Sequence, residues 1–261
     1  MDHEELLALY DRRVRRGAQS DAPDARIEYT PGVVRQSGSE SAWNGVLFCD
    51  LDEGGADAAI AEQVRHYTAL GRDFEWTHYA HDRPADLGAR LGAAGFRAED
   101  PETLMVAEIA ALPAGAPAAG VRIEAVTDEA GIEQVVAVHE QAFGTDGSRL
   151  RRRLLAQLTQ SPDVHSAYLA LAEQDGRAVA VSAARLELRP GTGFAGLWGG
   201  GTLEAWRGRG VYRALIAHRA RIAADAGYRY LQVDASSRSR PILQRLGFAA
   251  LTTITPYRYE P

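Results

Sequence analysis

The chain has 261 residues, 46% of them hydrophobic, and a formal net charge of −6 at pH 7, which suits one large or two modest globular domains. No apolar run reaches the roughly 18 residues of a transmembrane helix, and Cys49 is the only cysteine, so an intrachain disulfide is excluded. The negative charge argues against general nucleic-acid binding. The acidic start Asp2-His3-Glu4-Glu5 lacks the pattern of a signal peptide, and we expect a cytoplasmic protein without a membrane segment.

The first half of the chain alternates between strand and helix patterns. Apolar spacing predicts an amphipathic helix over residues 4–16 and another over 56–70, which Gly71 ends. A further helix ends at Gly95-Phe96. The predicted strands cover 27–29, 33–35, 43–51, 74–79 and 103–109.

A stretch rich in Ala, Pro and Gly follows, and we predict a linker at 113–120. Asp128 is expected to cap a helix that reaches Phe143, and Ser148 is expected to cap a second helix. Later helices are predicted from Val211 and over 239–246. The predicted strands cover 121–126, 167–172, 177–188, 194–203, 230–234 and the end of the chain through Tyr259.

One order of elements occurs twice. A strand, a glycine turn, a helix, Gly, a strand, Arg-Pro, a helix, Gly-Phe and a strand follow one another over 46–109 and again over 197–259. Chance similarity of two unrelated α/β segments is the alternative, but the order favours an internal duplication. The copies differ at the turn before the first helix, which reads Asp52-Glu53-Gly54-Gly55 in the first and Arg207-Gly208-Arg209-Gly210 in the second. Acids would repel a phosphate, so the first copy is not expected to bind one in this way.

The second turn has the composition of an anion-binding site. Glycines let the backbone approach a bulky anion, and a helix that starts at Val211 offers unpaired N–H groups and a partial positive charge. The turn is followed by neither a Gly-Lys-Ser/Thr sequence nor a third glycine at position 213, so it matches neither the kinase-type phosphate loop nor the dinucleotide fingerprint. Glycines 199–201 inside the preceding strand indicate a bulge.

Together, the bulged strand, the Arg-Gly loop, the helix, the strand and the short helix ending in Gly247-Phe248 resemble the GNAT superfamily of acyl-CoA-dependent N-acyltransferases. The resemblance covers about 121–261 and implies a mixed-sheet α/β fold, present here as a tandem GNAT-like pair. It implies a degenerate domain at 1–112 and a catalytic domain at 121–261. It also implies that acetyl-CoA binds at Gly201, Thr202, Leu203, Arg207, Gly208, Arg209, Gly210, Val211, Tyr212, Arg213 and Ser236.

The acid and base of the reaction are less clear from the sequence. Leu243 stands where many relatives have a tyrosine that protonates the leaving thiolate. Asp234, at a strand end, is our first candidate for the general base, and a loop-bonding role is the alternative. Glu187 and Tyr257 complete the catalytic candidates, with packing as the alternative for Tyr257. Structural roles are favoured for His139 and His165, and no metal is expected.

The sequence therefore predicts an acetyl-CoA-dependent N-acetyltransferase. The acetyl group is expected to pass directly to a primary amine of a small molecule or an amino acid derivative. The alternative is a non-catalytic acyl-CoA-binding regulatory protein, which the leucine at position 243 motivates. No nucleic-acid or membrane partner is expected, and monomer and homodimer both remain open.

Overall fold

The structure is a computed structural model that describes residues 2–40, 42–115 and 118–261. The chain forms two compact α/β units. The first comprises Met1–Met105 together with Asp234–Arg245 and Ala249–Pro261, and the second comprises Val106–Val233 with Leu246–Phe248. Each unit therefore combines a long continuous stretch with residues from the C-terminal part of the chain.

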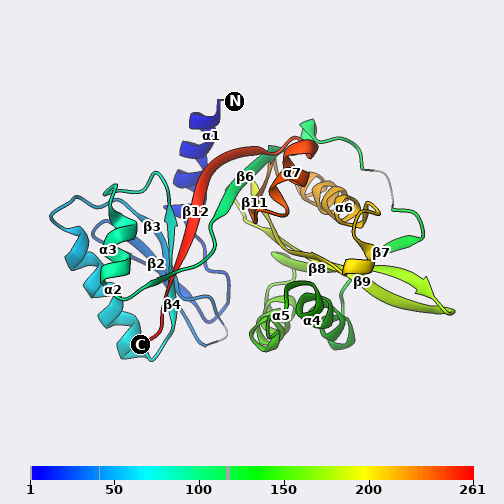
Figure 1. Cartoon of the computed structure of the whole chain (residues 1–261), viewed down its shortest axis with the longest axis horizontal. Helices are drawn as coiled ribbons and strands as arrows, with labels where there is room; N and C mark the ends of the chain where they lie inside the picture. Colours follow the sequence, from blue (N-terminus) through cyan, green and yellow to red (C-terminus); the bar gives the residue numbers. More distant parts are fainter. Residues whose placement is uncertain (1, 41, 116–117) are drawn as a thin grey trace. The chain divides into compact units, whose positions relative to one another are not determined.

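The first unit is a sheet with two helices packed on one face (Figure 1). Its strand order is β1-β2-β3-β4-β12, with β5 on β12, and only β3 and β4 run parallel. Its strands are β1 (Arg26–Thr30), β2 (Val33–Ser37), β3 (Gly45–Cys49), β4 (Phe74–Tyr79), β5 (Arg97–Ala98) and β12 (Ala249–Tyr259). Its helices are α1 (His3–Tyr10), the π-helical turn η1 (Asp11–Arg15), α2 (Ala56–Leu70), α3 (Leu87–Ala93) and α7 (Arg240–Leu246), whose last residue belongs to the second unit.

The core of the first unit lies between the sheet and α2 and α3. Fully buried side chains from β4, α2 and α3 meet there, among them Trp76, Tyr67 and Leu91. The Tyr67 hydroxyl shares its one proton between the carbonyl oxygens of Gln36 and Gly45, at 2.7 and 3.1 Å, so its polar end is satisfied inside the core.

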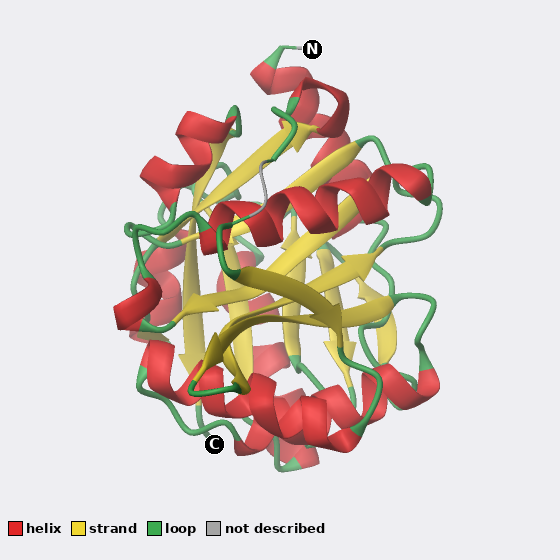
Figure 2. Cartoon of the chain, turned by 90° about the vertical axis from the view of Figure 1, so that its right-hand side faces the viewer, coloured by secondary structure: helices red, strands yellow, loops and turns green. Residues whose placement is uncertain are grey.

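The second unit is a sheet covered on both faces. Helices α4 (Glu129–Phe143) and α5 (Ser148–Gln160) lie on one face and α6 (Val211–Asp225) on the other, as Figures 1 and 2 show. The strand order is β11-β10-β9-β8-β7, in which only β10 and β11 run parallel. Its strands are β7 (Val121–Ala125), β8 (His165–Gln174), β9 (Arg177–Leu188), β10 (Phe194–Thr202) and β11 (Tyr230–Ala235), and β6 (Glu102–Glu108) continues into it from the first unit. The short 3-10 helices are η2 (Ile109–Ala111) and η3 (Glu204–Trp206).

The duplicated order of elements is confirmed at the level of backbone geometry. In each unit a parallel strand pair flanks a 15-residue helix, α2 in the first and α6 in the second. Gly71 and Gly227 follow these helices with φ of 62° and 82°, a conformation that other residues adopt only with strain. Gly95 and Gly247 follow α3 and α7 with φ of 97° and 99°.

Three details differ from the sequence expectation. The helix predicted over 4–16 is α-helical only to Tyr10 and continues as a π-helical turn. Ser148 is the first residue of α5 rather than its cap, because Gly147 holds the N-cap position. The C-terminal strand β12 belongs to the first unit, whereas the sequence predicts it as part of the catalytic domain at 121–261.

The predicted linker at 113–120 lies partly outside the described residues. Within the described ranges, no helix is both long and apolar enough to span a membrane.

Candidate active site

The candidate anion site of the second unit is the N-terminus of α6. Gly210 holds the N-cap position with φ 83°, no side chain caps the helix, and its first turn contains no acid. The first N–H groups of the helix are thus not covered by a protein carboxylate or hydroxyl at the cap. Such an end attracts a phosphate or another anion.

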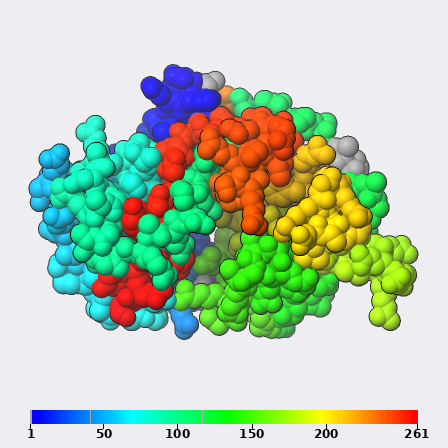
Figure 3. All heavy atoms as spheres, in the orientation of Figure 1, coloured from blue at the N-terminus to red at the C-terminus, as the bar shows by residue number. Residues whose placement is uncertain are grey.

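Three arginines surround this helix end. Arg207, Arg209 and Arg213 are exposed, and within the described residues none forms an ion pair with a carboxylate. The Arg207 Nε donates to the Thr202 carbonyl oxygen at 3.1 Å, and the Arg209 guanidinium lies 4.7 Å from the centre of the Trp206 ring. The segment before α6, yellow in Figure 3, lies at the surface. The loop therefore presents positive charge to solvent.

The predicted bulge in the preceding strand is confirmed. The pairing of β10 with β9 shifts register between Trp198 and Gly201, and Gly199 has φ 55°. A Cβ atom on Gly200 would lie 2.7 Å from the Tyr212 ring, whereas one on Gly201 would lie 2.9 Å from the Phe143 ring. Side chains from α6 and α4 thus pack directly on the backbone of the bulge, from opposite faces of the sheet.

The parallel strands separate at the same place. The pairing of β10 with β11 covers Phe194–Gly196 and Tyr230–Gln232 and stops before the bulge begins. Strands that diverge at their carboxyl ends leave backbone groups accessible, which is where open α/β sheets bind ligands.

Glu187, a predicted catalytic residue, is a carboxylate in this unit with an ion pair and a hydrogen bond. Its Oε2 accepts from Trp198 Nε1 at 2.7 Å and from Arg189 Nη2 at 3.0 Å. Burial alone would raise the pKa of Glu187, but the charge of Arg189 and these hydrogen bonds outweigh burial and lower the pKa. Its partners favour a role in holding Trp198, and its catalytic role stays a prediction.

Asp234 lies next to the last residue of β11 and is partly buried. Its charge acts on two other groups of the first unit, Glu102 and Tyr79. Burial raises the pKa of Glu102 to about 8, and the charges of Asp234 and Glu75 act in the same direction. Glu102 is a group that sequence reasoning missed, because nothing in the strand pattern of 103–109 indicates a perturbed carboxyl.

Two further predicted residues have structural partners. The Tyr257 hydroxyl lies only 2.5 Å from where a Cβ on Gly88 would be, and its ring packs on the core of the first unit. Ser236 accepts backbone N–H bonds from Ser239 and Arg240, through its hydroxyl at 3.4 Å and its carbonyl at 2.9 Å, in the turn before α7. Leu243 is fully buried in α7, so the position of the usual acid is part of the core.

The corresponding helix end in the first unit carries acids instead of arginines. Asp52 Oδ1 accepts the N–H of Gly55, the N-cap residue of α2, at 2.6 Å, and Asp57 lies in the first turn of the helix. These carboxylates bring negative charge to the helix end, which disfavours a bound anion.

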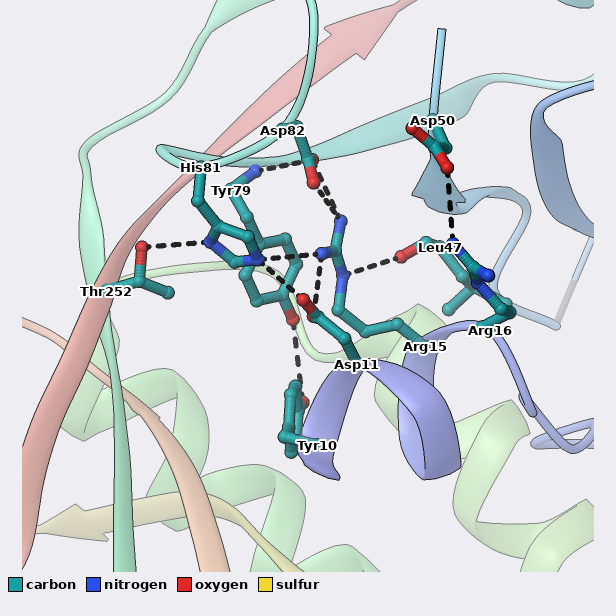
Figure 4. Close-up of polar contacts among 10 residues, drawn as sticks. All are labelled: Tyr10, Asp11, Arg15, Arg16, Leu47, Asp50, Tyr79, His81, Asp82 and Thr252. Carbon is teal, nitrogen blue, oxygen red and sulfur yellow. Dashed lines mark hydrogen bonds and ion pairs between the residues drawn. The ribbon is translucent and has the colours of Figure 1, made fainter. Parts of the chain in front are cut away.

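In the same unit, a buried ion-pair network lies at the carboxyl ends of β3 and β4 (Figure 4). The Arg15 guanidinium donates to both oxygens of Asp82 at 2.8 Å, to Asp11 at 2.9 Å and to the Leu47 carbonyl oxygen at 3.1 Å. It also lies 3.6 Å from the centre of the Tyr79 ring. Leu47 is in β3 and Tyr79 ends β4, so this side chain occupies the region where the parallel strands of the first unit diverge.

His81 and Asp82 are part of the same network. The carboxylate of Asp82 binds Arg15, and His81 Nε2 lies 2.8 Å from Asp11 Oδ2. Over the part of the chain that the structure describes, no group of three potential ligands could hold a metal ion.

Comparison with known protein families gives a match in the second half of the chain. Residues 132–248 match the model of the acetyltransferase (GNAT) family, so this part of the chain is a GNAT domain. No curated protein matches the sequence. The N-terminal half is not covered by the family model.

Solved structures share the fold over nearly the whole chain. A GCN5-related N-acetyltransferase from Kribbella flavida has 18% sequence identity and a TM-score of 0.70, over 98% of this chain and 95% of that one. One from Sphaerobacter thermophilus has 16% identity and a TM-score of 0.61, over 98% and 85% of the two chains. A tandem GNAT protein from the clavulanic acid biosynthesis pathway has 14% identity and a TM-score of 0.57, over 92% and 84%. The chain thus has the tandem GNAT-like fold that its sequence predicts.

Proposed function

We propose that the protein is an acetyl-CoA-dependent N-acetyltransferase that acts on a primary amine of a small molecule or an amino acid derivative. The observation that carries the proposal is the N-terminus of α6, which has glycine at the N-cap position and no side-chain cap, beside three exposed arginines and a bulged strand. The match of residues 132–248 to an acetyltransferase family supports it.

The residues fit a donor that carries a pyrophosphate. Gly208 and Gly210, with φ of 75° and 83°, allow the backbone to turn tightly without a side chain in the way. The N–H groups that follow Gly210 and the charges of Arg207 and Arg209 would hold the phosphates. The bulge residues Gly201 to Leu203 would lie along the pantetheine arm.

The reaction needs a neutral amine. Attack of the amine nitrogen on the thioester carbonyl forms a C–N bond and breaks the C–S bond, and the thiolate takes up a proton. We propose Asp234 as the base that removes the proton from the amine. Asp234→Asn should lower kcat and remove the corresponding limb of the pH–rate profile.

Calorimetric titration with acetyl-CoA tests the assignment of the loop. The double variant Arg207→Glu/Arg209→Glu should lose binding, because it reverses two charges at the phosphate site. Arg221→Glu is a matched control, since it makes the same change on an exposed residue near the far end of α6. Equal affinity of the double variant and the wild type would contradict the assignment.

A second candidate function is non-catalytic binding of acyl-CoA. The burial of Leu243 at the position of the usual acid favours it. Under this alternative the wild type binds acetyl-CoA but releases no free thiol with any amine. Thiol release with at least one amine excludes it.

A further inference from the structure

One arginine in the second unit is not explained by the structure around it. Arg185 lies in the middle of β9, in a run that is otherwise apolar from Ala178 to Ala184 apart from Ser182. Its side chain is partly buried, yet it forms no hydrogen bond or ion pair with any residue that the structure describes. A guanidinium in such a position costs free energy unless it binds something.

Arg185 lies against the bulge. It pairs with Trp198 across the two strands, and its Nε and Nη2 atoms are each 3.0 Å from where a Cβ on Gly199 would lie. The planar guanidinium therefore packs on Gly199, in the bulge that precedes the residues along which the proposed acyl donor would lie.

The charged groups near Arg185 do not neutralise its guanidinium. Arg153, from α5, acts on it as a like charge, and the Arg153 Nε is buried without a hydrogen-bond partner in the described chain. Glu187, two residues further along β9, is committed to Arg189 and Trp198. Burial and the charge of Arg153 lower the pKa of Arg185 to about 10, so it stays protonated at neutral pH.

The side chain lies on the face of the sheet that α4 and α5 cover. Besides Arg153, the charge of Arg185 acts on His139 of α4, whose pKa is lowered by burial and then by this charge. Arg219 of α6, on the opposite face, reaches only the backbone carbonyl oxygen of Arg185, at 2.8 Å. The loop arginines flank the N-terminus of α6, so Arg185 is separate from the proposed phosphate site.

We propose that Arg185 determines acceptor specificity by binding a carboxylate of the amine that the enzyme acetylates. The inference rests on the proposed function, and it narrows the acceptor to amines that carry a carboxylate, of which α-amino acids are the simplest class. The planar guanidinium can hold a carboxylate with two parallel hydrogen bonds. Its place beside the bulge would put the acceptor amine near the proposed path of the thioester.

The test uses the full chain and a panel of L-α-amino acids, each beside its primary amide. The wild type should acetylate the acids with higher kcat/KM than the amides. Arg185→Gln should reduce kcat/KM for the acids on the order of 10- to 100-fold, the worth of a hydrogen bond to a charged group. The amides should change little, and Arg185→Lys should retain part of the preference because it keeps the charge.

Arg177→Gln is the matched control, because Arg177 is an exposed arginine at the start of the same strand. It should leave both classes of acceptor unchanged. Binding of N-acetyl amino acids to the complex with CoA is a second readout that needs no turnover, and Arg185→Gln should weaken it by a similar factor.

Three outcomes would overturn the inference. These are equal use of acids and amides by the wild type, an unchanged preference in Arg185→Gln, and no binding of any N-acetyl amino acid to the CoA complex at millimolar concentration. Failure of the proposed function looks different, because the wild type would then not bind acetyl-CoA at all. Calorimetry with acetyl-CoA on Arg185→Gln also shows whether this variant is folded, since the α6 loop does not use Arg185.

Discussion

At the residue scale, the first unit depends on Arg15. Its side chain is 3% exposed and that of Asp82 is 2% exposed, so removing the arginine leaves an uncompensated buried carboxylate. We expect Arg15→Met to lower the free energy of unfolding by about 3–5 kcal/mol. Arg16→Met is the control, because its pair with Asp50 is exposed at 58% and 62% and should contribute about 0–1 kcal/mol. Urea unfolding measures both, and equal midpoints for the two variants would contradict the assignment.

The carboxyl of Glu102 gives a pH dependence of stability. Its pKa is about 8 in the folded chain against 4.5 for the free group, so the folded state keeps a proton that the unfolded state loses. Stability should therefore fall as the pH rises from 4.5 towards 8 and then level off. Glu102→Gln removes the titrating carboxyl and so this pH dependence. The difference between the urea midpoint of the variant and that of the wild type should therefore rise between pH 4.5 and 8. A difference that is constant with pH would show that Glu102 titrates normally.

At the element scale, the C-terminal strand stabilises the N-terminal unit. Six residues of β12 from Ile254 to Tyr259 pair with β4, and Ile254 is 1% exposed. Ile254→Ala should cost about 2–5 kcal/mol, because it leaves a cavity in a buried position. Hydrogen exchange should accelerate in β4 (Phe74–Tyr79) more than in β8 (His165–Gln174). A larger effect in β8 would contradict the assignment of β12 to the first unit.

The elements also show what the sequence could and could not predict. Helix 56–70 and strands 74–79 and 177–188 were predicted to the residue, because glycines and apolar periodicity mark their ends locally. The ion pair between Arg15 and Asp82 joins residues 67 positions apart. Arg185 becomes a candidate for binding the acceptor only because the fold places it beside the bulge. Such contacts depend on tertiary structure, so the loop could be predicted whereas the acceptor side of the site could not.

At the scale of the whole molecule, a duplicated fold should have one donor site. The second unit offers an uncapped helix N-terminus with exposed arginines. In the first unit Asp52 accepts the N–H of Gly55, the N-cap residue of α2, Asp57 lies in the first turn of that helix, and Arg15 fills the diverging strand ends. We therefore expect calorimetry to give one acetyl-CoA per chain. Gly210→Glu should abolish this binding, because a side chain at φ 83° is strained and its carboxylate repels the phosphates.

The control for this prediction is Gly55→Glu, which makes the same change at the N-cap position of α2 in the first unit. It should leave acetyl-CoA binding unchanged, because Asp52 and Asp57 already place negative charge at that helix end. A stoichiometry of two, or binding that survives Gly210→Glu and is lost in Gly55→Glu, would assign the donor site to the first unit. One site that responds only to Gly210→Glu would mean that the duplication retained the fold twice and the donor site once.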